Sequence, residues 1–241
     1  MEPPQFSNYP RQPKGEIDFS SIGRAWQVFM ANPGPFIVGV LIIMAIGAVL
    51  YLLSMPFTIG MAIAQGSANT FAEALPLMLQ RQVISMFIGI GVSVVSAPFV
   101  LGLSIMSLKA VRGEKAEISD LMSGWQQAGP AIVVVLLSQL AIQIGMNFCC
   151  IPGLLAGGLF LVALPILADK KCGPMEAISQ SWSLMSKHLI MASLFFIVTG
   201  LVALIGFCAC IVGALATLPM YYICQVIVYE DLATLDPAPS V

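Results

Sequence analysis

Long apolar runs separated by short polar stretches dominate the chain. Six of these runs approach the length of a membrane span, which needs about 20 apolar residues within a range of roughly 17 to 25. We predict an all-α integral membrane protein with six transmembrane helices. The six are Pro35–Met55, Val83–Ala110, Pro130–Phe148, Pro152–Ala168, His188–Ile205 and Cys208–Val228. The fourth run is short, so it either tilts little or is a buried helix between longer neighbours.

Three tryptophans, Trp26, Trp125 and Trp182, lie just ahead of apolar runs. Apolar residues stand four and seven positions before each of them, which is the spacing of one face of a helix. An amphipathic helix that carries Trp beside a membrane-length run is typical of the membrane interface. We therefore predict that the tryptophans anchor three amphipathic interfacial helices, over residues 18–31, 117–128 and 174–187.

The two patterns together predict one unit used three times, an interfacial helix followed by a transmembrane pair. This threefold pseudo-repeat divides a single membrane domain, residues 17–230, into units 17–112, 113–171 and 172–230. The second span of each unit carries a proline, which supports the repeat; the three are Pro98, Pro165 and Pro219. Proline is common in membrane helices, so chance is the alternative explanation.

Composition agrees with a membrane protein. Hydrophobic residues make up 59% of the chain and charged residues 9%, whereas about 25% of the residues in an ordinary soluble domain are charged. A soluble fold of 241 residues cannot bury that much apolar surface. The Pro-rich residues 1–16 are predicted to be a disordered tail, and residues 231–241 a flexible one. No basic patch interleaved with aromatic residues indicates nucleic-acid binding.

The basic residues predict the orientation. Six spans place both termini on one side of the membrane, together with nine of the ten Lys and Arg residues, while Arg81 falls on the other side. Because cytoplasmic loops carry the excess of Lys and Arg, the side of the termini is predicted to be cytoplasmic. We expect a multi-pass protein of the bacterial cytoplasmic (inner) membrane with both termini in the cytoplasm.

Residues suited to catalysis form no recognisable pattern. His188 is the only histidine, whereas hydrolytic triads and metal sites usually need several well-placed His, Cys or carboxylate groups. The middles of the spans also lack the charged residues that ion-coupled pumps use. We expect no enzyme, no cofactor and no metal. Gly153–Gly157 is a GxxxG motif, for which packing within the chain is favoured over dimerisation.

The third span carries the densest polar set, Gln139, Gln143 and Asn147, spaced along one helix face. Amides in hydrocarbon need hydrogen-bond partners, so this polar stripe is predicted to face a partner helix, a cavity or another subunit. It either holds helices together or lines a path for a solute.

The outer side is predicted to hold one long loop and two tight turns. The loop Pro56–Gln82 either lies on the outer surface or re-enters the bilayer, and Asn69 or Thr70 is placed to cap a short helix in it. The turns hold four cysteines. These act as small buried hydrophobes, bind a soft metal or, as our hypothesis, form one disulfide between the turns. The four are Cys149, Cys150, Cys208 and Cys210.

Several different short motifs are distributed over the second half of the chain, from about Val111 to Leu232. They are Arg112-Gly113-Glu114-Lys115, Ile118-Ser119-Asp120-Leu121, Ile151-Pro152-Gly153, Ile166-Leu167-Ala168-Asp169, Glu176-Ala177, Ser181-Trp182 and Tyr229-Glu230-Asp231-Leu232. This half resembles a broad group of uncharacterised bacterial membrane proteins, which includes the YciC-like proteins and the membrane domain of some glycerophosphodiester phosphodiesterases. In those phosphodiesterases a separate soluble domain performs the chemistry, so the resemblance implies a membrane fold and no catalytic residue.

Wide apolar faces and interfacial helices favour a non-enzymatic membrane scaffold or accessory subunit that acts through its helix surfaces. The alternative is a passive transporter or channel for a neutral or amphiphilic solute, lined by Gln139, Gln143 and Asn147. The expected partners are membrane lipid and either other membrane protein subunits or a second copy of the chain, but not nucleic acid.

Overall fold

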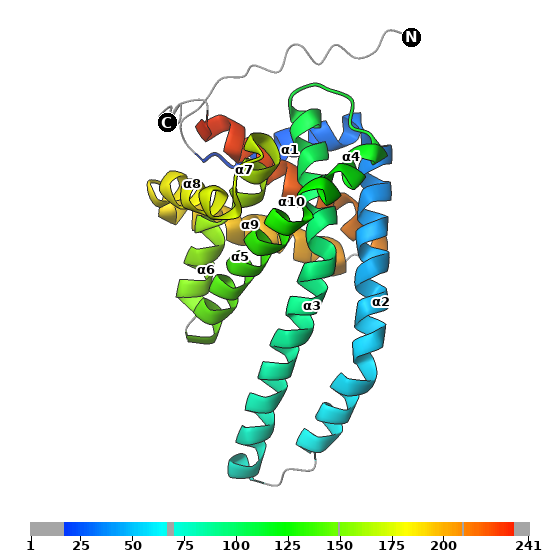
Figure 1. Ribbon diagram of the computed structural model, residues 1–241, viewed down its shortest axis with the longest axis vertical. Helices are drawn as coiled ribbons and strands as arrows, with labels where there is room; N and C mark the ends of the chain where they lie inside the picture. Colours follow the sequence, from blue (N-terminus) through cyan, green and yellow to red (C-terminus); the bar gives the residue numbers. More distant parts are fainter. Residues whose placement is uncertain (1–16, 67–69, 149, 209, 234–241) are drawn as a thin grey trace.

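The computed structural model describes residues 17–66, 70–148, 150–208 and 210–233, which are helical apart from short connections (Figure 1). The helices are α1 (Ser20–Ala31), α2 (Pro33–Gly66), α3 (Phe71–Val111), α4 (Ile118–Ser123), the 3₁₀ helix η2 (Gly124–Gln127), α5 (Ala128–Phe148), α6 (Cys150–Leu159), α7 (Ala163–Lys170), α8 (Pro174–Ser186), α9 (Leu189–Cys208) and α10 (Cys210–Ala233). The prediction of an all-α protein is confirmed for this part of the chain.

The two longest helices, α2 and α3, form a hairpin that extends beyond the rest of the molecule (Figure 1). With its 41 residues, α3 would be about 60 Å long if straight, roughly twice the thickness of a bilayer's hydrocarbon core. The described residues of the expected outer loop Pro56–Gln82 are mostly helical, because α2 continues to Gly66 and α3 begins at Phe71. Thr70 is an N-cap, as predicted, and accepts a hydrogen bond from Glu73 N, but the helix that it caps is the 41-residue α3 and not a short helix.

Five helical stretches in the described part of the chain are long and apolar enough to cross a membrane. They are Pro33–Gly60, Leu75–Val111, Ile118–Asn147, Cys150–Lys170 and Leu189–Gly206, and they overlap the first five expected spans. The chain is therefore built as a multi-pass membrane protein. The sixth expected span, α10, is not among them. Its C-terminal half is mostly buried and carries polar residues, namely Tyr221, Tyr222, Gln225, Glu230 and Asp231.

The fourth stretch is the buried one. In its most apolar part 56% of the residues are buried, so the alternative of a buried helix between longer neighbours is the one that the structure adopts. A short turn after Leu159 divides it into α6 and α7. Pro165 lies in the first turn of α7, where the N–H that proline lacks has no partner within the helix.

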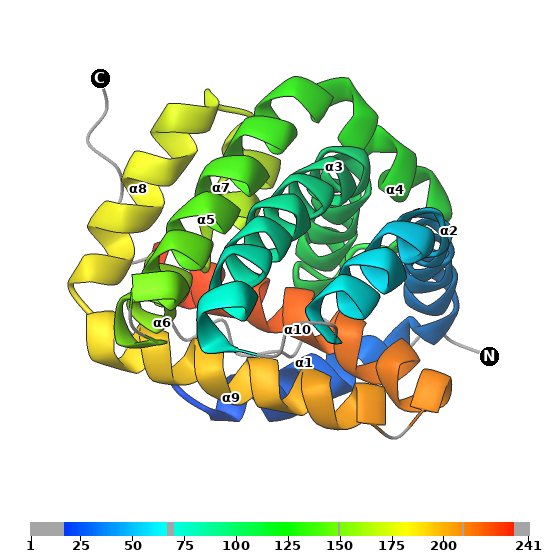
Figure 2. The same cartoon turned by 90° about the horizontal axis from the view of Figure 1, so that it is seen from below.

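Three short helices, α1, α4 and α8, lie at the end of the molecule away from the hairpin tip (Figure 1). They occupy three different sides of this end, and α9 and α10 pack together crosswise to α2 and α3 (Figure 2). In the contacts between helices, α4 packs on α3, α8 on α7 and α1 on α10. The sequence had predicted helices over 18–31, 117–128 and 174–187, and helices form in all three ranges.

The core lies at this same end, where α3 and α7 meet and where α10 packs on α3. Its fully buried side chains include Leu101 and Met106 of α3, Leu167 of α7 and Ile223 of α10. These side chains pack in the space between the three helices.

Two glycines bring α4 and η2 against the backbone of α3. A Cβ atom at Gly102 would stand 2.2 Å from Leu121 O, and one at Gly124 would stand 2.1 Å from Pro98 O. Because both neighbours are backbone atoms, no side chain can rotate to make room, and only glycine fits at these positions.

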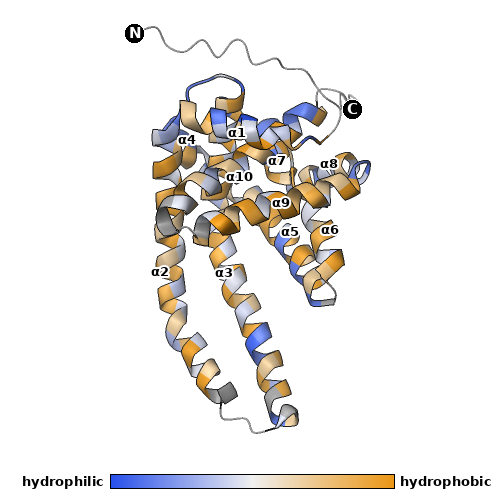
Figure 3. Cartoon of the chain, turned by 180° about the vertical axis from the view of Figure 1, so that it is seen from behind, coloured by the Kyte–Doolittle hydropathy of each residue, from blue (hydrophilic) through white to orange (hydrophobic). Residues whose placement is uncertain are grey.

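Away from this end, apolar residues cover much of the surfaces of α2 and α3 (Figure 3). At its far end, α10 continues to Ala233, three residues into the expected tail 231–241, because Asp231 and Leu232 are buried. Residues 1–16 and 234–241 lie outside the described part. The GxxxG motif packs within the chain, because a Cβ at Gly153 would meet Met146 and one at Gly157 would meet Phe196.

Candidate functional site

Charged residues gather where α3, α7 and α10 end. Arg112, which directly follows α3, pairs with Asp169 of α7 and with Glu230 of α10, each at 2.7 Å. Its Nε also donates a hydrogen bond to Glu230 Oε1 at 2.8 Å. The hydrogen bond to Asp169 is the main cause that raises the pKa of Arg112, so the guanidinium stays cationic. One side chain therefore joins the C-terminal ends of three helices.

Tyr229 and the acidic end of α10 complete this cluster. The Tyr229 hydroxyl donates a hydrogen bond to Asp169 Oδ2 at 2.8 Å, and burial together with this bond raises the pKa of Tyr229. Acidic side chains are unfavourable in the last turn of a helix, because the exposed carbonyls there carry partial negative charge. Glu230 and Asp231 occupy this place in α10, and the arginines that pair with them offset the cost.

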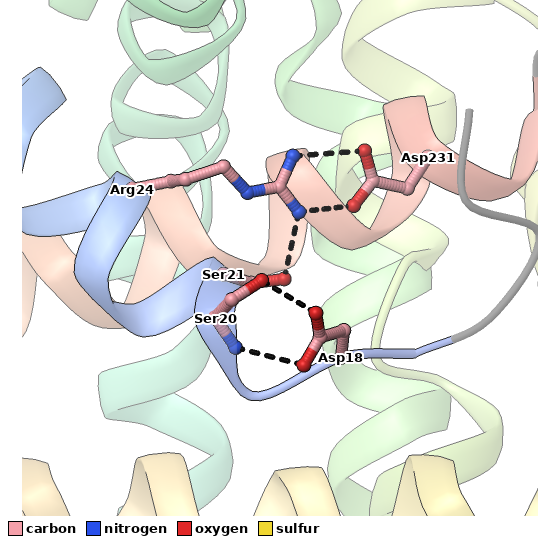
Figure 4. A network of polar contacts seen from close by, with 5 residues as sticks. All are labelled: Asp18, Ser20, Ser21, Arg24 and Asp231. Carbon is pink, nitrogen blue, oxygen red and sulfur yellow. Dashed lines mark hydrogen bonds and ion pairs between the residues drawn. The ribbon is translucent and has the colours of Figure 1, made fainter. Parts of the chain in front are cut away.

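The second arginine is Arg24 of α1, which faces Asp231 through both of its terminal nitrogens (Figure 4). Its Nη1 donates to Asp231 Oδ1 at 3.0 Å, and its Nη2 donates to Asp231 Oδ2 and to Ser21 Oγ. Asp18 accepts a hydrogen bond from Ser20 N at the start of the helix. The hydrogen bond to Asp231 is the main cause that raises the pKa of Arg24. This pair connects the first helix of the described chain to the last.

The third pair joins α3 to α4. Lys109 of α3 pairs with Asp120 of α4, whose Oδ2 also accepts a hydrogen bond from Glu117 N at 2.9 Å. The Asp120 carboxylate therefore caps the N-terminus of α4 and also joins α4 to α3. Sequence reasoning had used these charges only for orientation and for the family resemblance. The signal for the cluster was that charges stand at the same end of every predicted second span.

The predicted tryptophan anchors all present exposed rings. Trp26 is 46% exposed, and Trp125 and Trp182 are each 52% exposed. Trp125 meets Phe99 edge to face at 5.5 Å between ring centroids, and Trp182 lies 6.2 Å from Phe160. Other exposed apolar side chains on the same helices extend these surfaces, namely Met30, Ile118, Met122 and Met175. The helices α1 and α8, and α4 taken together with η2, therefore each carry an exposed tryptophan and at least one other exposed large apolar residue.

The predicted polar stripe lies on the exposed side of α5, since Gln139, Gln143 and Asn147 are all exposed. The Asn147 side chain donates a hydrogen bond to Gln143 O at 2.9 Å and accepts one from Gln82 Nε2 of α3 at 3.2 Å. The end of the stripe near the expected outer turn is therefore joined to α3, and Gln82 and Asn147 lie at the same level of the molecule.

Cysteine and histidine offer no assembled site in the described part of the chain, where no group of three or more His, Cys, Asp or Glu side chains is arranged to hold a metal ion. Cys150 and Cys208 have free thiols. The other two cysteines of the disulfide hypothesis lie outside the description, Cys149 entirely and Cys210 by its side chain. His188 lies in the turn between α8 and α9 and is half-buried.

The charged cluster and the tryptophan helices are therefore the places where side chains from distant segments converge. Comparison with protein-family models found no match, and neither the curated proteins nor the solved structures contained a chain that matches this one.

Proposed function

We propose that the chain is a non-enzymatic scaffold or accessory subunit of the bacterial inner membrane, which acts through its helix surfaces. The observation that carries this proposal is the apolar hairpin α2–α3. In the most apolar stretch of each of its helices only 17% of the residues are buried, and Leu53 and Phe87 are 73% and 64% exposed. Contiguous apolar surface of this extent needs to be covered by lipid or by the helices of a partner.

A photo-crosslinking scan tests the proposal. A photoreactive phenylalanine analogue at Leu53 or Phe87 is expected to form an adduct with another membrane protein, or with a second copy, at one constant mass. The same analogue at Leu167, which is fully buried, is the matched control and should give no such adduct. Adducts with lipid alone at both exposed positions would contradict a scaffold.

The proposed architecture has six spans in a threefold pseudo-repeat, with α10 as the sixth span. Three repeated contacts support it: α4 lies on α3, α8 lies on α7, and α1 lies on α10. The interfacial helices of the second and third units, α4 and α8, each pack on the second span of the unit before. The interfacial helix of the first unit, α1, packs on the second span of the third unit, as expected if the three units are arranged in a ring. The pairs Phe99–Trp125 and Phe160–Trp182 are matched in the same way.

In the proposed orientation the charged cluster and both termini are cytoplasmic, and the hairpin tip is on the outer side. The positive-inside rule supports this, because Arg24, Lys109 and Arg112 lie in the cluster whereas Arg81 lies toward the tip. In a variant without native cysteines, an impermeant maleimide should label Gln80→Cys in intact cells and Ser183→Cys only after lysis. The reverse labelling would overturn the orientation.

The alternative function is a passive path for a neutral or amphiphilic solute. The exposure of Gln139 and Gln143 on α5 favours it, because unburied amides in a span suit a wet surface. Flux in reconstituted liposomes tests this function. Flux that falls in Gln143→Leu but not in Ile142→Leu would replace the scaffold with a transporter, and no flux in the wild-type protein would eliminate the alternative.

A further inference from the structure

The helix α8 differs from α1 and α4 in the surface that it presents. It has three faces along its length. One is buried and includes Ala177, Ser181 and Met185, and it is held by a hydrogen bond from Ser181 Oγ to Leu159 O at 2.7 Å. The second is apolar and exposed, with Met175 at 64% and Trp182 at 52% exposure. The third is polar, so α8 can lie in an interface with hydrocarbon on one side and water on the other.

Basic residues stand at both ends of α8. Lys170 and Lys171 come just before it, and Lys187 and His188 come just after it. The only acidic residue between Lys170 and His188 is Glu176. That carboxylate accepts a hydrogen bond from Gln180 Nε2 at 3.0 Å, and Gln180 Oε1 accepts one from Lys170 Nζ at 2.8 Å. A chain of hydrogen bonds therefore already occupies Glu176, and from Lys170 to His188 three lysines stand against one carboxylate.

The two other interfacial helices have different charge surroundings. From Gly113 to Gln127, around α4, three acidic residues face one lysine. Around α1, Arg24 is turned toward Asp231 and Asp18 accepts from Ser20. Only α8 therefore combines an exposed apolar face and an exposed Trp with an excess of lysines at its ends.

We propose that α8 binds anionic phospholipid headgroups, with its lysines on the phosphates and with Met175 and Trp182 among the acyl chains. Lysine stems extend along apolar surface while their ammonium groups reach the headgroups, so both contacts are made at once. Each lysine near an anionic surface contributes about fivefold in affinity. The proposal rests on the interfacial placement that the proposed function assumes.

The test compares two single-tryptophan variants reconstituted in nanodiscs of phosphatidylcholine with a minority of phosphatidylglycerol. One variant keeps Trp182 (W26F/W125F), and the other keeps Trp125 (W26F/W182F) as the matched control. Bromine on the acyl chains of either lipid quenches a nearby Trp. Brominated phosphatidylglycerol should quench Trp182 about threefold more, per mole of lipid, than brominated phosphatidylcholine, because the lysines concentrate the anionic lipid there.

The same preference should be absent at Trp125. It should weaken at Trp182 in K171Q/K187Q, which keeps Lys170 beside α8, and it should disappear in 1 M salt, where charges are screened beyond about 3 Å. Equal quenching of Trp182 by the two lipids would overturn the proposal, as would an equal preference at Trp125. Failure of either lipid to quench Trp182 would instead refute the interfacial placement, so the two failures are distinguishable.

Discussion

Replacement of Gly102 by alanine tests whether α4 lies directly on the backbone of α3. The new Cβ would stand 2.2 Å from Leu121 O and 2.7 Å from Leu121 Cα, whereas ordinary contact begins at 3.4 Å. Relief requires α4 to retreat by about 1 Å, and the close approach of Gly124 to Pro98 O resists a sliding movement. Overpacking of this kind costs about 1–3 kcal/mol. For a chain of this size, that corresponds to a fall in Tm of roughly 3–10 °C.

The assay is thermal denaturation of the purified protein in mild detergent, followed by tryptophan fluorescence. The matched control is Gly91→Ala on the same helix, where a Cβ meets nothing within 4 Å and alanine should be neutral or slightly stabilising. Displacement of α4 should also change the Trp125 signal, because this ring packs on Phe99. Equal Tm values for Gly102→Ala and Gly91→Ala would show that α4 does not lie directly on the backbone of α3 at Gly102.

Three further substitutions probe the polar contacts. Arg112→Gln leaves Asp169 and Glu230 without their cation, and it should lower the free energy of unfolding by about 1–2 kcal/mol because the ion pairs are half-exposed. The control Lys115→Gln, at an exposed position, should leave the free energy of unfolding unchanged. Equal effects of the two substitutions would show that Arg112 does not stabilise the fold through these ion pairs. Asp231→Asn should release α1 and make it more sensitive to limited proteolysis, and unchanged cleavage would show that the ion pair does not hold the helix. Asn147→Ala should cost about 0.6 kcal/mol by loss of its contact with Gln82, and a cost above 2 kcal/mol would indicate a larger polar network than the one seen.

The tryptophan helices were predictable because each has an apolar face and a polar face, which together produce a helical spacing of apolar residues in the sequence. Apolar residues at helical spacing in a segment with polar neighbours have few other solutions, and α1, α4 with η2, and α8 form where this pattern stands. The first five predicted spans were also predictable, but their lengths were not. The stretch from Pro56 to Gln82 looked like a loop because it holds prolines and charges, yet α2 contains Pro56 and α3 contains Pro76. Each proline removes one backbone hydrogen bond, and the hydrogen bonds of the neighbouring turns are enough to keep the segment helical.

The charged cluster could not be predicted in the same way. Positions along one helix determine which residues share its faces, but they do not determine which helix ends meet. Arg112 lies 118 residues from Glu230, so their pairing depends on how α3 packs against α10. The same limit applies to the polar stripe. Its spacing indicates that Gln139, Gln143 and Asn147 share one face of α5, but not that Asn147 meets Gln82 of α3.

The pairing of the first and last helices has a consequence for biogenesis. Arg24 and Asp231 are separated by 207 positions in the chain. Bacterial and other ribosomes add about 5–20 residues per second, so roughly 10–40 s pass between the synthesis of these two residues. During this time α1 has already left the ribosome, but α10, the helix on which it packs, does not yet exist. The contact between α1 and α10 therefore forms only after the last helix has been made, and until then the residues that α1 buries in the fold lack this partner.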